Sequence, residues 1–268
     1  MRVLIKQDEN KIAQWTANYL IKKINDFNPT IKKPFVLGLP TGSSPIATYK
    51  ELIRRNKIGD ISFKHIITFN MDEYIGIPEN HPQSYHSFMY EKLFNHIDIP
   101  SENINILKGN ASNLEKECIE YEKKILKYGG IDIFLGGIGM DGHIAFNEPG
   151  SSLTSRTSIK ILCYDTIQAN SRFFENDAHQ VPSAALTVGV GTIMDAREVL
   201  VIVSGYKKAR ALKEVVEGAV NHMWPASMLQ MHPKCILVCD EPSTLEFQVK
   251  TVKYFKDIER ISTDGSPQ

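Results

Sequence analysis

The chain has no excess of either charge, few cysteines and no long apolar stretch. Its 268 residues carry 31 Lys and Arg against 31 Asp and Glu, so it has no overall basic field to hold a nucleic-acid backbone. The longest apolar runs, such as residues 199–203, are far shorter than the roughly 20 residues that cross a bilayer. The first ten residues also lack the apolar core of a signal peptide. We therefore expect a soluble, cytoplasmic protein that binds neither nucleic acid nor membrane.

Cysteine is too sparse for a disulfide framework. The four cysteines include no C-x-x-C pair, and three of them lie in segments typical of buried strands or helices. Cys235 and Cys239 would point to the same face of one strand, which favours burial over metal binding. We interpret all four, Cys118, Cys163, Cys235 and Cys239, as reduced core thiols.

The order of apolar segments predicts the fold class. Apolar residues make up 42% of the chain and charged residues 23%, as in ordinary globular domains. Short β-branched runs predict strands near residue 3 and at 35–39, 65–69, 131–136, 199–204 and 235–239. Apolar residues at three-and-four spacing predict helices over 10–26, 44–56, 113–128, 206–217 and 243–255. This alternation predicts a single α/β domain with a mostly parallel, doubly wound, Rossmann-like sheet, and a frayed tail at 262–268.

In such sheets ligands bind beyond the carboxyl ends of the strands, so the segments that follow strands are the first candidates for a site. FVLGLPTGSSP, residues 35–45, is a strand followed by a loop rich in glycine and hydroxyls, with Pro45 opening a helix. Gly42 permits close backbone approach, and the helix start favours an anion near Thr41, Gly42, Ser43 and Ser44. An ordinary turn capped by a serine is the alternative. A Walker loop is excluded because no lysine follows the glycines.

IITFNMDEYIG, residues 66–76, runs from a hydrophobic strand into Asp72 and Glu73. Adjacent residues leave a strand on opposite sides, so one of these carboxylates is a candidate base and the other a structural group. Two solvated loop acids remain the alternative.

IDIFLGGIGMDGHIAFNEPG, residues 131–150, contains G-x-G-x-x-G after a strand. We reject dinucleotide binding, because the fingerprint should open a long helix and this loop runs instead into Asn147, Glu148 and Pro149. The loop offers Asp141, His143 and Glu148 for one small ligand, and an imidazole between carboxylates is a tunable proton shuttle. A metal site is the competing use, although no H-E-x-x-H helix and no thiolate accompany it.

Two further segments carry cations that could meet an anion. Lys207 and Lys208 lie in the first turn of the helix predicted after residue 204, where they oppose its dipole unless an anion is near; a solvated surface pair is the alternative. Arg172 precedes a polar, turn-rich stretch that has the character of a covering loop, and this stretch is followed by the strand-like ALTVGVG, residues 185–191. The guanidinium of Arg172 can bind a phosphate with two hydrogen bonds. The sequence leaves open which of the two lysines would contact a phosphate.

Taken together, these segments closely resemble the glucosamine-6-phosphate deaminase family. Seven motifs stand in the expected order over essentially the whole chain: GLPTGSSP, FNMDEYIG, GGIGMDGHIAFNEPGSSL, SRFF, ALTVGVGT, EGAVNHMWPAS and CDEPSTLE. The resemblance implies conversion of glucosamine 6-phosphate and water to fructose 6-phosphate and ammonia, as in amino-sugar catabolism, without a cofactor.

The resemblance also implies roles for individual residues. Asp72 would move the C2 proton of the open-chain sugar to C1, and His143 would help to open the pyranose ring. Asp141 and Glu148 would flank His143 and favour its charged form. The phosphate would lie between residues 41–44, Arg172 and Lys208, under a lid at about residues 158–187.

Members of this family are commonly hexamers, and some are activated by N-acetylglucosamine 6-phosphate at an interface site. The resemblance places that site at the N-terminal backbone, Ser151, Lys160 and Tyr254. Activated relatives carry a basic residue at position 158 and a threonine at 161, where this chain has Ser158 and Ile161. We therefore expect weak or absent activation.

Two rival functions are retained. A 6-phosphogluconolactonase on the same architecture would use a similar phosphate loop and a histidine, but it would not need Asp72 as a carbon base. A non-catalytic sugar-phosphate sensor usually carries a DNA-binding extension, and we see neither such a segment nor a basic face.

Overall fold

The computed structural model describes the backbone of residues 1–264 and the side chains of residues 1–261. The strands are β1 Arg2–Lys6, β2 Phe35–Leu39, β3 Ile66–Asn70, β4 Asp72–Tyr74, β5 Ile104–Asn105, β6 Ile133–Gly137, β7 Ser158–Ile161, β8 Ala184–Thr187, β9 Glu198–Val203 and β10 Cys235–Asp240. The α-helices are α1 Glu9–Phe27, α2 Ile46–Lys57, α3 Tyr85–Lys92, α4 Leu114–Lys127, α5 Tyr164–Ser171, α6 Val190–Met194, α7 Ala209–Val216 and α8 Val249–Asp264. Short 3-10 helices are Phe94–His96, Ser101–Asn103, Ala178–Gln180, Tyr206–Lys208, Pro225–Met231 and Pro242–Thr244.

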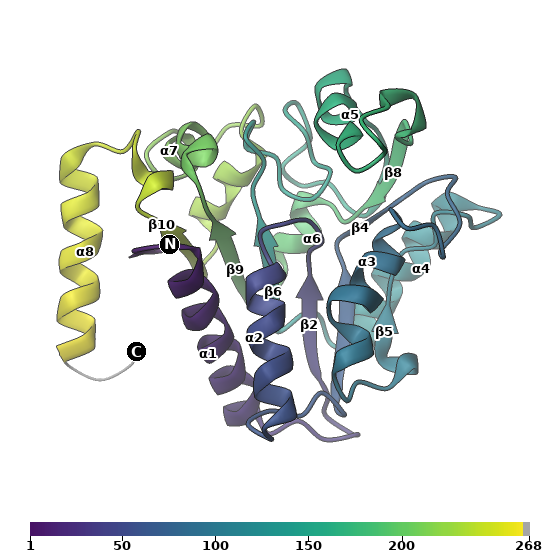
Figure 1. Ribbon diagram of the computed structural model, residues 1–268, viewed down its shortest axis with the longest axis horizontal. Helices are drawn as coiled ribbons and strands as arrows, with labels where there is room; N and C mark the ends of the chain where they lie inside the picture. Colours follow the sequence, from purple (N-terminus) through teal and green to yellow (C-terminus); the bar gives the residue numbers. More distant parts are fainter. Residues whose placement is uncertain (265–268) are drawn as a thin grey trace.

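Seven strands form one parallel sheet in the order β1-β10-β9-β6-β2-β3-β5. A smaller antiparallel sheet, β4-β8-β7, stands beyond the end of β3. The predicted mostly parallel α/β fold is confirmed, with helices on both faces of the sheet (Figure 1).

The alternation of side chains along each strand explains the two layers of helices. Leu37 of β2 and Leu200 of β9 pack with α1, α2 and α3 on the face toward the viewer in Figure 1. Val36 and Val201, one residue away, pack with α4, α6 and α7 on the other face. Because successive side chains leave a strand on opposite sides, each buried strand contributes to both cores.

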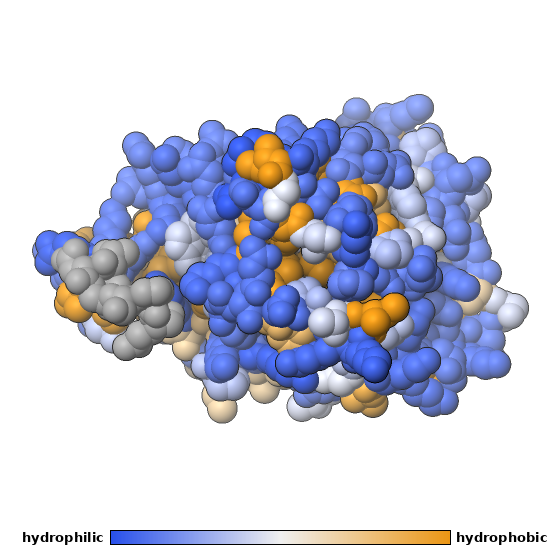
Figure 2. Space-filling view, turned by 90° about the horizontal axis from the view of Figure 1, so that it is seen from below, coloured by the Kyte–Doolittle hydropathy of each residue, from blue (hydrophilic) through white to orange (hydrophobic). Residues whose placement is uncertain are grey.

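The strand order places the site. After β2 the chain moves through β3 to β5 at one edge, whereas after β6 it moves through β9 to β10 on the other side. β2 and β6 are neighbours, so the loops that follow them diverge and leave a crevice at the carboxyl ends of the strands. The opposite end of the molecule is mostly hydrophilic, with apolar residues toward the middle of that face (Figure 2).

Two expectations about local structure are wrong. The apolar stretch after Thr187 is not a strand, because Val190–Met194 form α6 and the Gly189 backbone lies so near Ser155 that a Cβ there would be 2.0 Å from its carbonyl oxygen. The helix predicted over 243–255 begins only at Val249, after a 3-10 turn in which Asp240 accepts from the N–H of Ser243. Of the tail predicted at 262–268, the backbone of residues 262–264 belongs to α8, and residues 265–268 lie outside the described residues.

The cysteine prediction holds for three residues. Cys118, Cys235 and Cys239 are buried free thiols, and the last two lie in the same core cluster, as expected for one face of β10. Cys163 is exposed, so interpreting it as a core thiol was wrong; it precedes α5, on a segment that crosses the surface. No helix within residues 1–264 has the length and apolar composition needed to span a membrane.

Candidate active site

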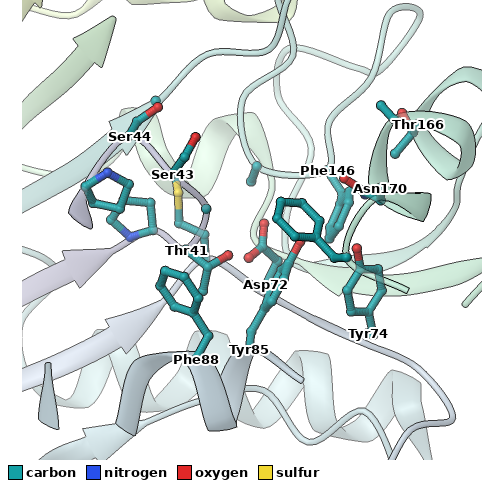
Figure 3. A pocket seen from close by; sticks show the side chains of 18 of the residues that line it. Thr41, Ser43, Ser44, Asp72, Tyr74, Tyr85, Phe88, Phe146, Thr166 and Asn170 are labelled. Atoms are coloured by element: carbon teal, nitrogen blue, oxygen red, sulfur yellow. The ribbon is translucent and has the colours of Figure 1, made fainter. Parts of the chain in front are cut away.

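A cavity of about 330 Å³ opens at the carboxyl ends of four neighbouring strands, β9, β6, β2 and β3. The loops that follow these strands form its floor and walls, and α5 with the residues after it covers one side. In Figure 3 the Asp72 carboxylate lies in the middle, between the loop of Thr41 and Ser43 and the side chains of Thr166 and Asn170. This volume suits a small ligand of the size of a sugar phosphate.

The loop after β2 presents its backbone and hydroxyls to the cavity. Thr41, Gly42, Ser43 and Ser44 all line it, and Gly42 has a φ of +89°, a conformation open to glycine. α2 starts two residues later than expected, at Ile46, and no side chain caps its amino end. Unpaired N–H groups and the helix dipole favour an anion at such a position.

Two cations approach the cavity from different directions. Lys208 lines the floor, where its Nζ donates to the carbonyl oxygen of Ile138 at 2.7 Å, and burial lowers its pKa. Arg172 lines the cover, is exposed, and lies over the ring of Phe173 at 4.7 Å. Lys207 is exposed and is not among the lining residues, so of the two lysines the geometry favours Lys208 for an anion.

Asp72 follows β3, and its carboxylate is buried in the cavity. The residue is 7% exposed, and its Oδ1 has no hydrogen-bond partner among the described residues. Burial, with a smaller effect of the charge on Glu73, raises the pKa of Asp72 to about 8. A carboxylate with such a pKa can accept a proton from carbon near neutral pH.

Glu73 points to the other side of the chain. Its carboxylate accepts from the backbone N–H groups of Tyr74, Tyr85 and His86 at 2.8, 2.9 and 2.8 Å, which caps the amino end of α3. Burial raises the pKa of Glu73, and these backbone hydrogen bonds partly offset the rise. The adjacent carboxylates thus differ in function: Asp72 faces the cavity, and Glu73 holds α3 in place.

Two tyrosines of the cavity were missed by the sequence analysis. Tyr85 is anchored through its N–H to Glu73 and stacks parallel to Phe146 at 6.0 Å, and its hydroxyl lies near those of Thr41 and Tyr74. Burial raises the pKa of Tyr85 far above its usual value, so the hydroxyl keeps its proton. In the sequence the two tyrosines, Tyr74 and Tyr85, look like ordinary core aromatics. Only the position of Tyr74 close to Asp72 could have indicated that one of them lines the cavity.

The loop after β6 brings Asp141 to His143. Oδ1 of Asp141 lies 2.7 Å from Nδ1 of the histidine and also accepts from its backbone N–H at 3.2 Å. Burial tends to raise the pKa of Asp141, but the hydrogen bond and charge of His143 outweigh it and hold the pKa below its usual range. His143 lines the cavity, and the contact at Nδ1 leaves Nε2 for a ligand.

Gly139 explains why the loop resembles a dinucleotide fingerprint without being one. A Cβ at this position would lie 2.1 Å from Nδ1 of His143 and 2.4 Å from Oδ1 of Asp141. The N–H of Gly139 donates to the carbonyl oxygen of His143 at 2.8 Å, which closes a tight loop and opens no long helix. The glycine therefore makes room for the carboxylate–imidazole pair.

Glu148 does not flank His143 in this structure, so that expectation is corrected. Its carboxylate accepts from the backbone N–H of Cys163 at 3.1 Å and from the hydroxyl of Thr166. Asp141 is the only carboxylate within ion-pair distance of His143 among the described residues. Side-chain direction on an irregular loop does not follow a helix or strand period, so sequence spacing could not supply it.

The residues expected at an allosteric site lie outside this cavity. Lys160 and Ile161 are on β7, where Ile161 is exposed, and Ser151 lies in the loop before it. Tyr254 is exposed on α8, which packs beside β1 at the edge of the sheet (Figure 1). As for metals, no three His, Cys, Asp or Glu side chains of the described residues come together as an ion site.

Comparison with known proteins adds independent findings. The sequence profile of a family described as glucosamine-6-phosphate isomerases/6-phosphogluconolactonase matches residues 7–237. The glucosamine-6-phosphate deaminase of Borreliella afzelii (strain PKo) is 64% identical over 260 residues, which are 97% of each chain. That of Phocaeicola vulgatus (strain ATCC 8482) is 62% identical over 262 residues, 98% of this chain and 100% of the relative.

Solved structures of other proteins have a similar fold. A monomeric glucosamine-6-phosphate deaminase superposes with a TM-score of 0.86 and 39% identity, covering 91% of this chain and 98% of that protein. The 6-phosphogluconolactonase of Trypanosoma cruzi superposes with a TM-score of 0.72 over 92% and 97% of the two chains. At 18% identity the latter likeness concerns the fold alone.

Proposed function

The chain belongs to the family of glucosamine-6-phosphate isomerases and 6-phosphogluconolactonases, and we propose that it converts glucosamine 6-phosphate and water to fructose 6-phosphate and ammonia. The observation that carries this choice is the buried Asp72 carboxylate with a pKa of about 8. Isomerisation needs a base for a carbon-bound proton, whereas hydrolysis of a lactone does not. The relatives named as deaminases, at more than 60% identity, support the same choice.

The phosphate binds first, remote from the reacting carbons. The backbone and hydroxyls of residues 41–44 and the ammonium of Lys208 form the fixed part of its site, and Arg172 adds the contact from the cover. All of them line the cavity. Binding energy from this group holds C2 of the sugar against the base.

His143 opens the pyranose ring by moving a proton at the ring oxygen through Nε2. Asp141 orients the imidazole at Nδ1, 2.7 Å away, which leaves Nε2 toward the sugar. Asp72 then takes the proton from C2 of the open-chain sugar, which gives an enolamine, and returns it to C1. The resulting imine at C2 is hydrolysed by water, which releases ammonia and leaves the ketose.

The atoms and electrons of these reaction steps balance without an outside oxidant or reductant. C1 gains the hydrogen that C2 loses, and water supplies the oxygen that replaces nitrogen. The proposed reaction therefore proceeds without a cofactor.

We further propose that residues 158–187 act as a lid and that the protein works in the cytoplasm as a homo-oligomer of hexameric size, in N-acetylglucosamine degradation. Lys160 on β7 and Tyr254 on α8 belong to separate parts of one chain. An N-acetylglucosamine 6-phosphate site built from both would have to be shared between two copies. Ser158 and Ile161 offer no charge to a second phosphate, so we expect little activation.

The test is incubation of the purified protein with glucosamine 6-phosphate while ammonia and fructose 6-phosphate are followed together. Equal amounts of the two products, with kcat reduced about 10²–10⁴-fold in Asp72→Asn, would support the function and the base. Asp26→Asn, a surface change in α1, is the matched control and should leave kcat unchanged. Hydrolysis of 6-phosphogluconolactone without ammonia release would favour the lactonase.

A further inference from the structure

Glu148 connects a fixed part of the molecule to the cover of the cavity. On the fixed side its neighbour Asn147 is fully buried, and the amide of Asn147 donates to the carbonyl oxygens of Ile144 and Val188 at 2.9 and 2.8 Å. The hydroxyl of Ser155 donates to the amide oxygen of Asn147 at 3.3 Å. The backbone that carries Glu148 is therefore held to the scaffold.

On the other side the Glu148 carboxylate takes the place of a cap for α5. Cys163, the residue before this helix, offers no side-chain cap, and its N–H donates to Oε2 of Glu148 at 3.1 Å. Thr166, in the first turn, donates its hydroxyl to Oε1. A negative charge at a helix start is favourable, because it meets unpaired N–H groups and the positive end of the dipole.

The packing of this helix is shallow. α5 buries no side chain completely, and Ile167 packs partly buried against the cluster that contains Phe146 and Phe174, so the contacts at the ends of the helix add to a limited apolar contact. Its residues Thr166, Ala169 and Asn170 line the cavity, and the spacing of three and four puts them on one helix face. Thr166 is the residue of this face that also bonds to Glu148. It therefore belongs both to the cavity wall and to the contact between α5 and the loop that follows β6.

From these contacts we infer that Thr166 is a positioning residue: its hydroxyl ties α5 to the carboxylate of Glu148, so that the cavity-lining face of α5 is held in place by the loop that follows β6. This inference rests on the proposed function for its kinetic consequence, but not for its structural one. Arg172 follows α5 directly, so a displaced α5 would also carry the exposed phosphate contact away.

The kinetic test compares two substitutions at one position. Thr166→Val keeps the shape but removes the hydroxyl, and we expect kcat/KM for glucosamine 6-phosphate to fall about ten-fold, as for loss of a hydrogen bond to a charged group. Thr166→Ser keeps the hydroxyl and should restore most of the activity. Gln168→Ala, on the exposed side of the same helix, is the control and should behave as wild type. If Thr166→Ser were as impaired as Thr166→Val, the hydroxyl would not be the group that positions α5, and the inference would be overturned.

A double-mutant cycle separates positioning from a direct role. In a Glu148→Ala background the acceptor is gone, so Thr166→Val should add less than a two-fold further loss. A full ten-fold loss in that background would overturn the inference, because Thr166 would then act without Glu148.

A structural measurement needs no turnover. Amide hydrogen exchange of a peptide covering residues 162–174, read by mass spectrometry, should be about five- to ten-fold faster in Thr166→Val and unchanged in Thr166→Ser and Gln168→Ala. Unchanged exchange in Thr166→Val would overturn the link between α5 and Glu148. If the wild-type protein released no ammonia while exchange behaved as expected, the proposed function would fail and the link would stand.

Discussion

The floor and the cover of the cavity are built on opposite principles. The floor takes its groups from the ends of buried strands and from α3: Asp72 is 7% exposed, and Tyr85 of α3 is fixed between Glu73 and Phe146. The cover contributes the exposed Arg172 and a helix, α5, without a buried side chain. A fixed floor sets the pKa of Asp72 before any ligand arrives, whereas under the proposed closure a loosely held cover would make its contacts only when the cavity is closed.

The largest expected effect tests the floor through the pH dependence of stability. Asp72 has an ordinary pKa of 3.8 and a folded-state pKa of about 8, so between these values the folded protein binds more protons than the unfolded chain. Its contribution to the free energy of unfolding is therefore fully present below pH 4. It is lost as the pH rises through 8, by up to about 1.4 kcal/mol per pH unit.

Asp72→Asn does not titrate, so its stability relative to wild type should rise steadily between pH 4.5 and 8.5. Urea unfolding at three pH values measures the difference, with Asp26→Asn as the control for a surface carboxylate. A difference that stays constant with pH would mean that the floor does not perturb Asp72.

The second prediction compares floor and cover directly. Lys208→Met should lower kcat/KM about 100-fold, because a partly desolvated ammonium interacts strongly with a phosphate dianion. Arg172→Met should lower it about ten-fold, because an exposed guanidinium is screened by water and salt. Lys207→Met, at the neighbouring exposed lysine, should have little effect. Equal losses at Lys208 and Arg172 would remove the distinction between the two halves of the phosphate site.

The smallest expected effect concerns the second layer of the floor. Tyr85→Phe removes the hydroxyl that lies near Thr41 and Tyr74 but keeps the ring against Phe146. We expect KM for glucosamine 6-phosphate to rise about three-fold, because the phosphate loop loses one support, with kcat nearly unchanged. Steady-state kinetics beside a Tyr90→Phe control on α3 would measure it, and a large fall in kcat would place Tyr85 in the chemistry instead.

The sequence predicted the floor better than the cover, for physical reasons. Buried parallel strands consist of continuous β-branched runs, so the ends of β2, β3, β6 and β9 could be located, and with them Asp72 and His143. The end of β8 was misplaced, because Gly189 and the contact with Ser155 override the β-propensity of the valines that follow.

The sequence analysis failed where a residue's contribution depends on the direction of its side chain rather than on its residue type. Tyr74 and Tyr85 carry the same apolar signal as core aromatics, and only tertiary packing brings the Tyr85 hydroxyl near Thr41 and the Tyr74 hydroxyl near Tyr85. Glu148 was predicted as a partner of His143 from its proximity in sequence, yet its side chain turns to Cys163 and Thr166. Cys163 was taken for a core residue, although the segment before α5 runs over the surface. Local sequence carries no information on such long-range choices.

The order of the sheet has a consequence for synthesis on the ribosome. Within the part of the chain that the structure describes, the first strand, β1, pairs only with β10, more than 200 residues later, whereas β2, β3, β5 and β6 pair among themselves within residues 35–137. At roughly 5–20 residues per second, the apolar β1 waits on the order of ten seconds or longer for its partner to emerge. The middle of the sheet can form first, and the edge strand is the part of the nascent chain that most needs protection from premature association.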